Sequence, residues 1–68
     1  MNLKLKAKII EKFGTQADFA SVLKGDESFV SRVIHGRRYL SAEKQKAWAN
    51  ILDCEQNQIF EIGIENNV

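Results

Sequence analysis

Residues 15–38, TQADFASVLKGDESFVSRVIHGRR, decide the fold that this sequence predicts. Apolar residues recur at helical spacing over 16–24, directly after Thr15, and again over 27–35, directly after Asp26. Thr and Asp are both preferred N-cap residues, so each apolar run is predicted to be a helix. Gly36 ends the second run, because glycine is favoured just past a helix C-terminus. Only about three residues separate the two helices, a spacing typical of a helix-turn-helix corner.

Three further helices are predicted around this corner. One spans about 3–13 and ends at Gly14, one runs from a Ser41 cap to about Leu52, and a short one spans about 55–60. We therefore expect an all-α domain of five helices over residues 1–60. The apolar residues expected to pack together are Ile9, Ile10, Phe13, Phe19, Ala20, Leu23, Trp48, Ile51, Leu52, Ile59 and Phe60.

The short tail, residues 61–68, has two interpretations. Phe60, Ile62 and Ile64 alternate with Glu and Gly, as in a half-buried strand that would pair with its mate from a second chain. Helical packing of Phe60 on Ile64, or fraying, is the alternative. The tail is thus a candidate dimerisation strand.

The size and composition exclude several classes of function. Sixty-eight residues, 44 % of them hydrophobic and 28 % charged, fit one small globular domain. One cysteine and one histidine exclude a Cys/His zinc site and an internal disulfide, and no apolar run is long enough for a membrane span. The sequence also offers no residue cluster suited to catalysis. We expect a cytoplasmic protein without enzymatic activity, catalytic residues, metal, cofactor, small-molecule ligand or membrane contact.

The second helix of the corner separates its residues into two faces. At about 100° per residue, Phe29, Val30, Val33 and Ile34 fall on one side, and every other residue of the helix is polar. The polar face carries Glu27, Ser28, Ser31, Arg32 and His35, and is followed by Arg37 and Arg38. Such a face suits the DNA major groove. There Arg can donate hydrogen bonds to guanine, Glu can accept one from the amino group of cytosine, and Ser can donate or accept. On pattern alone, a merely solvated face remains an alternative.

The corner resembles the helix-turn-helix of the Cro and phage-repressor-like transcriptional regulators. The family pattern has Thr-Gln, an Ala four residues after the Gln, an Ile/Val-Ser-Arg-Ile/Val run, and a Gly before a basic residue. This chain has, at matching spacings, Thr15-Gln16, Ala20, Val30-Ser31-Arg32-Val33 and Gly36-Arg37. The likeness continues into residues 52–60 and covers nearly the whole chain from Leu3 to Phe60. It implies a compact five-helix fold of the lambda-repressor-like type.

The resemblance also implies roles for individual residues. Glu27, Ser28, Ser31 and Arg32 would read DNA bases, and the backbone would be contacted by Thr15, Gln16, His35, Arg37 and Arg38. The implied function is a small prokaryotic or phage transcriptional regulator, with repression as the expected mode. It would bind a double-stranded operator as a homodimer, because one such module reads only a half-site. The alternative is a protein-interaction module on the same fold, such as an antirepressor or regulatory subunit.

The chain departs from the family pattern at three places. Lys24-Gly25 stands where the family has Gly and then an apolar residue, so the turn glycine is shifted by one. Asp53 replaces a glycine that often needs positive φ, for which Asp is one of the better substitutes. Phe29 replaces a small polar residue; bracing of the core is favoured over contact with a thymine methyl group.

Three lysines, Lys4, Lys8 and Lys12, form a stripe along the first helix. A solvated surface is favoured over contact with DNA for this stripe. Lys8 and Lys12 are nearest to a plausible DNA backbone.

Overall fold

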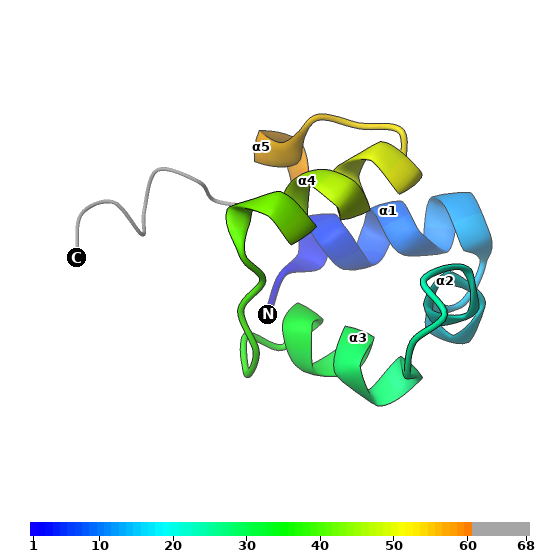
Figure 1. Ribbon diagram of the computed structural model, residues 1–68. Helices are drawn as coiled ribbons and strands as arrows, with labels where there is room; N and C mark the ends of the chain where they lie inside the picture. The colour runs from blue at the N-terminus through cyan, green and yellow to red at the C-terminus, as the bar shows by residue number, and fades with distance from the viewer. Residues whose placement is uncertain (61–68) are drawn as a thin grey trace.

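The computed structural model describes residues 1–60, and this part of the chain is entirely helical. The helices are α1 (Leu3–Phe13), α2 (Gln16–Val22), α3 (Glu27–Ile34), α4 (Ala42–Ile51) and α5 (Gln56–Ile59). Helix α1 runs through the middle and packs against α2, α3 and α5, while α4 packs against α5 (Figure 1). The prediction of an all-α fold with five helices in this order is confirmed for residues 1–60. The tail, residues 61–68, and with it the candidate dimerisation strand, lies outside the described residues.

Four of the five helices are slightly shorter than predicted. Helix α1 has the expected bounds, but α2 ends at Val22 rather than Lys24, and α3 ends at Ile34 rather than His35. Helix α4 ends one residue early, and α5 loses one residue at each end relative to 55–60. In α2, α3 and α4 the missing residues belong to the turn that follows the helix.

Helices α2, α3 and α4 end in the same hydrogen-bonded turn. The first residue past the cap has positive φ, namely Lys24 (58°), Gly36 (79°) and Asp53 (57°). Its N–H donates to the carbonyl three residues back, and the next N–H donates to the carbonyl five residues back, at 2.8–3.2 Å. This is the Schellman arrangement, which satisfies the last carbonyls of a helix. The expectation for Asp53 is confirmed, whereas Lys24 itself, and not the shifted Gly25, adopts the left-handed conformation.

Side chains cap the N-termini of α1 to α4. The expected caps are confirmed: Thr15 Oγ1 accepts from Asp18 N at 3.1 Å, Asp26 Oδ1 from Ser28 N at 3.1 Å, and Ser41 Oγ from Lys44 N at 3.2 Å. A fourth cap, Asn2, was not predicted, although its position directly before α1 is that of a favoured cap residue. Its Oδ1 accepts from Leu5 N at 3.0 Å.

Asn2 also ties α1 to two other helices. Its backbone N–H donates to the carbonyl of Ile34 at the end of α3, at 2.6 Å. Its side-chain Nδ2 donates to the carbonyl of Ile59 in α5, at 2.5 Å. One half-buried residue near the chain start therefore joins three helix ends.

The core is centred on Trp48, which is 4 % exposed. Phe19 meets the Trp48 ring edge-on at 5.0 Å between centroids, and Phe29 and Phe60 approach it at 6.3 and 6.4 Å. The buried residues are Leu5, Ile9, Phe19, Ala20, Val30, Val33, Ile34, Leu40, Trp48, Ala49, Leu52, Ile59 and Phe60.

Two expectations about the core were wrong. Ile10 is 45 % exposed and Ile51 is 36 % exposed. Leu5, four residues before Ile9, and Ala49, next to Trp48, are buried in their place. On α1 the core takes residues four apart, and Ile10 is turned about 100° from Ile9 towards solvent.

Candidate nucleic-acid interface

Helix α3 is buried on one face and exposed on the other, as its sequence predicts. Val30, Val33 and Ile34 are at most 6 % exposed and belong to the core. Glu27, Ser28, Arg32 and the capping residue His35 are exposed, and Ser31 is half-buried. Burial of the apolar face fixes how α3 is rotated, and this rotation turns its polar side chains outward.

The predicted base-reading residues share one shallow hollow with a residue of α2. This hollow is lined by Gln16, Glu27, Ser28, Ser31 and Arg32. Gln16 is the first residue of α2 and the others come from α3, so the α2–α3 corner brings them together. The hollow offers an amide, two hydroxyls, a carboxylate and a guanidinium. These groups can donate and accept hydrogen bonds side by side, as recognition of base edges requires.

His35 extends this surface at the C-terminal end of α3. Its Nδ1 lies 2.8 Å from the carbonyl oxygen of Ser31 and 3.4 Å from Ser31 Oγ. A carbonyl oxygen only accepts, so we assign the proton to Nδ1, which donates to it. The exposed ring then offers Nε2 as an acceptor when neutral and as a donor when protonated. Only the protonated form can donate a hydrogen bond from Nε2 to a phosphate.

Arg37 and Arg38 are held at the same end of α3 by their backbone. Both N–H groups donate to the carbonyl of Arg32, at 2.8 and 3.3 Å. The guanidinium carbon of Arg38 lies 5.5 Å from the centroid of the Phe29 ring. This stacking was not predicted, because nothing in the sequence brings residues nine positions apart together across a turn. Phe29 does brace the core against Trp48, as favoured from the sequence.

Thr15 lies beside the hollow but does not line it. Its hydroxyl oxygen accepts from Asp18 N and so caps α2. The hydroxyl hydrogen remains available as a donor, since a hydroxyl both donates and accepts. Among the predicted backbone contacts, Gln16 thus lines the hollow, and Thr15, His35, Arg37 and Arg38 do not.

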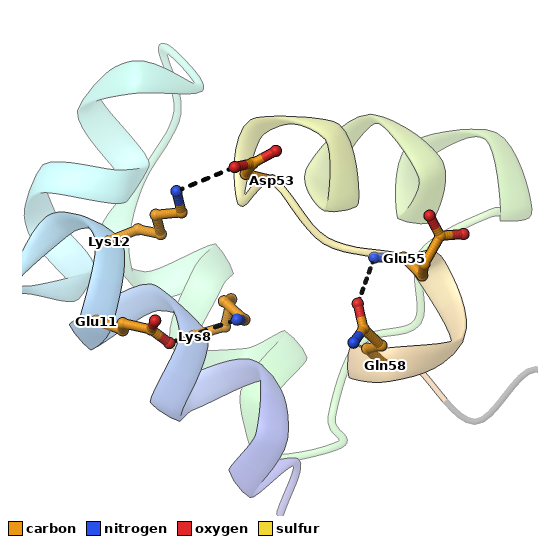
Figure 2. A network of polar contacts seen from close by, with 6 residues as sticks. All are labelled: Lys8, Glu11, Lys12, Asp53, Glu55 and Gln58. Carbon is orange, nitrogen blue, oxygen red and sulfur yellow. Dashed lines mark hydrogen bonds and ion pairs between the residues drawn. The ribbon is translucent and has the colours of Figure 1, made fainter.

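Two of the three stripe lysines of α1, Lys8 and Lys12, form ion pairs with carboxylates. Lys8 pairs with Glu11 at 3.4 Å, and Lys12 pairs with Asp53 of the α4–α5 turn at 3.4 Å. Figure 2 shows Lys12 extended from α1 towards Asp53. The same view shows the start of α5, where Gln58 Oε1 accepts from Glu55 N at 2.6 Å. Exposed pairs of this kind contribute about 0–1 kcal/mol each. Because Lys8 and Lys12 are paired with Glu11 and Asp53, a solvated surface is still favoured over contact with DNA for the lysine stripe.

Residues 1–60 contain neither a candidate metal site nor a membrane-spanning helix. No three His, Cys, Asp or Glu side chains in this range are grouped so that they could hold a metal ion. No helix in the same range is long and apolar enough to cross a membrane.

Comparison with known proteins returned no match: no family model, no curated protein and no solved structure matches this chain. The resemblance to the Cro and phage-repressor-like regulators therefore rests on the residues quoted from the sequence. The geometry of the α2–α3 corner is the structural feature that bears on function.

Proposed function

We propose that this chain is a sequence-specific double-stranded DNA-binding protein of the lambda-repressor-like helix-turn-helix type. In this proposal it acts as a small transcriptional regulator, with repression as its mode. The observation that carries the proposal is the hollow in which Gln16 of α2 meets Glu27, Ser28, Ser31 and Arg32 of α3. A merely solvated face would not require base-reading side chains and a neighbouring helix start to share one surface.

Each side chain has a role that follows from its chemistry. Arg32 donates two hydrogen bonds to guanine, Glu27 accepts from the amino group of cytosine, and Ser28 and Ser31 donate or accept. Gln16 and Thr15 at the start of α2 donate to phosphate oxygens, as do Arg37, Arg38 and protonated His35 after α3. Phosphate contacts fix the position of α3 on the duplex, and base contacts select the sequence.

The acidic start of α3 adds selectivity. Asp26 and Glu27 are both exposed, and their charges repel phosphate on any duplex. Glu27 is favourable only where a base offers it a donor, which in the major groove is the amino group of cytosine or adenine. The two carboxylates therefore lower non-specific affinity more than specific affinity.

The proposal includes a homodimer on DNA. A single helix-turn-helix reads a short half-site, and two copies related by a two-fold axis read half-sites about 34 Å apart. The site would accordingly be a palindrome. No enzymatic activity, cofactor or small-molecule ligand is proposed.

Selection of binding sites from random duplexes at stated salt tests this function. The expected result is enrichment of one palindromic sequence. Affinity for that sequence should fall with salt by about 0.9 log–log units for each phosphate neutralised. Arg32→Ala should weaken binding to that sequence, whereas Lys46→Ala, which removes an exposed cation from α4, is the charge-matched control and should not.

Two outcomes would contradict the proposal. If no sequence is enriched and no duplex binds at low salt, the DNA-binding function is wrong. If instead a protein partner binds through α3 with an affinity that salt leaves nearly unchanged, the chain is a protein-interaction module on the same fold.

A further inference from the structure

Phe29 lies at the border between the buried and exposed faces of α3. Its half-buried ring packs against Trp48 of α4 at an interplanar angle of 77°. On the helix it lies roughly 60° beyond Arg32, going from the polar face towards the core. The outer side of the ring thus borders the Arg32 edge of the candidate interface.

This outer side is covered by Arg38. The guanidinium carbon lies 5.5 Å from the ring centroid, within the range of about 6 Å for a cation–π contact. The backbone of the same residue is fixed by its hydrogen bond to the carbonyl of Arg32, at 3.3 Å. Both the start and the end of the Arg38 side chain are therefore held. A guanidinium held over an aromatic ring still has N–H groups available as donors to another partner.

Resting on the proposed function, we infer that Phe29 is a positioning residue that holds Arg38 ready to bind a DNA phosphate. Arg38 lies beyond the Arg32 edge of the polar face, whereas Gln16 reaches the hollow from α2. The two residues would thus contact backbone on the two sides of α3 in the major groove. In this inference Phe29 acts through Arg38 and reads no base, because the guanidinium lies over its ring.

The physical basis is preorganisation. An exposed arginine samples many rotamers and loses this freedom when it binds phosphate. Stacking on a ring that is itself packed against Trp48 removes part of that loss before DNA arrives. This contribution of Phe29 to DNA affinity is the same for every DNA sequence, because a phosphate carries no information about the base.

A double-mutant cycle on DNA affinity tests the inference, using Phe29→Leu, Arg38→Ala and the combined variant. Phe29→Leu should weaken binding about two- to fivefold, equally on the selected and on a scrambled duplex. In the Arg38→Ala background the same change should have no further effect, because there is no guanidinium left to position. Phe29→Tyr keeps an aromatic face and should restore wild-type affinity.

Phe60→Leu is the matched control for loss of an aromatic ring from the core. Phe60 packs against Trp48 at 6.4 Å, close to the 6.3 Å of Phe29, but comes from the α4–α5 side of the molecule. All variants are compared at a temperature at which circular dichroism shows them folded. Phe60→Leu should lower stability without the Arg38-dependent change in affinity.

The outcomes separate this inference from the proposed function. If the wild-type chain binds no duplex, both are overturned. If it binds, and the effects of Phe29→Leu and Arg38→Ala multiply independently, only the positioning role of Phe29 is overturned. Nuclear magnetic resonance of the free chain adds a test of the stack without DNA. Ring-current shifts of the Arg38 side-chain protons should be present in the wild type and lost in Phe29→Leu, and unshifted wild-type protons would overturn the inference.

Discussion

The α2–α3 corner and the α4–α5 corner are built on the same turn. In each, a leucine cap is followed by a non-glycine residue at φ 58° or 57°, namely Lys24 or Asp53. Each turn makes the same pair of backbone hydrogen bonds, and each leads through an acidic residue, Asp26 or Glu55, into the next helix. The backbone turn alone therefore cannot indicate which corner binds a partner.

The helices that follow the two turns differ. Helix α3 has eight residues and exposes a polar face beside Gln16. Helix α5 has four residues; Ile59 is buried, and Gln56 Nε2 donates to Gln45 Oε1 of α4 at 2.9 Å. The first corner presents side chains outward, while the second closes the core. The two corners differ in the surface that folding leaves exposed. Variants of the first should therefore change binding, and variants of the second should change stability.

The largest effect on stability is expected at Asn2, which holds α5 in place. Asn2→Ala removes the cap of α1 and the hydrogen bond to the carbonyl of Ile59. We expect a loss of about 2–3 kcal/mol in the free energy of unfolding, the sum of a cap and a hydrogen bond. Urea denaturation measures it, with Asn50→Ala on the exposed side of α4 as the control.

In contrast, Asn2→Ala should leave DNA affinity unchanged in the folded variant. Its backbone hydrogen bond to Ile34, at the end of α3, does not involve the side chain and remains. A loss of DNA affinity in the folded variant would contradict the assignment of binding to the α2–α3 corner and of core closure to the α4–α5 corner.

The second expected effect is on binding and belongs to α3. Arg32→Ala should cost roughly 1–3 kcal/mol of binding free energy and relax the preference at one base pair. Asn57→Ala, at an exposed position of α5, should change neither affinity nor preference. Fluorescence anisotropy on the selected duplex and its single-base variants measures both. Equal losses for Arg32→Ala on all of these duplexes would show that Arg32 contacts phosphate and reads no base.

A smaller effect is expected from the two left-handed residues themselves. Lysine at φ 58° is strained relative to glycine, so Lys24→Gly should raise the free energy of unfolding by about 0.5–1 kcal/mol. Asp53→Gly should gain less, because Asp tolerates this conformation better and the change removes the ion pair with Lys12. Thermal denaturation compares the two.

Lys46→Gly, inside α4, is the control and should lower stability by about 1 kcal/mol. A larger gain from Asp53→Gly than from Lys24→Gly would mean that the two turns are not equivalent.

The helices and the exposed face of α3 could be predicted because both depend on residues that are close together in the sequence. Cap residues and the spacing of apolar residues act within a few positions, and burial of Val30, Val33 and Ile34 then fixes which face is exposed. The sequence did not predict that Lys24 would take the left-handed position beside an available Gly25. There the hydrogen bonds of the turn and the packing of α3 outweigh the preference of one residue.

Contacts between distant parts of the chain were also missed. The bond from Asn2 to Ile59 and the stacking of Arg38 on Phe29 depend on how helices and turns come together in space. No local pattern encodes either of them. The polar residues of α3 in the candidate site could be predicted from the pattern of that helix alone. The role proposed for Phe29, to position Arg38, could not, because it depends on a contact across a turn.

The smallest expected effect concerns Cys54, which follows Asp53 as Gly25 follows Lys24. Burial raises the pKa of the Cys54 thiol above its ordinary value, and the nearby positive charge of Lys8 partly offsets this rise.

The unfolded chain therefore loses the thiol proton at a lower pH than the folded chain. The contribution to stability is complete below the ordinary cysteine pKa and is lost as the pH rises through the raised value. Urea denaturation from pH 7 to 10 should show a steeper decline for the wild type than for Cys54→Ala, which lacks this titration; the packing that the variant also loses does not depend on pH. Parallel declines would mean that folding does not raise the pKa of the Cys54 thiol.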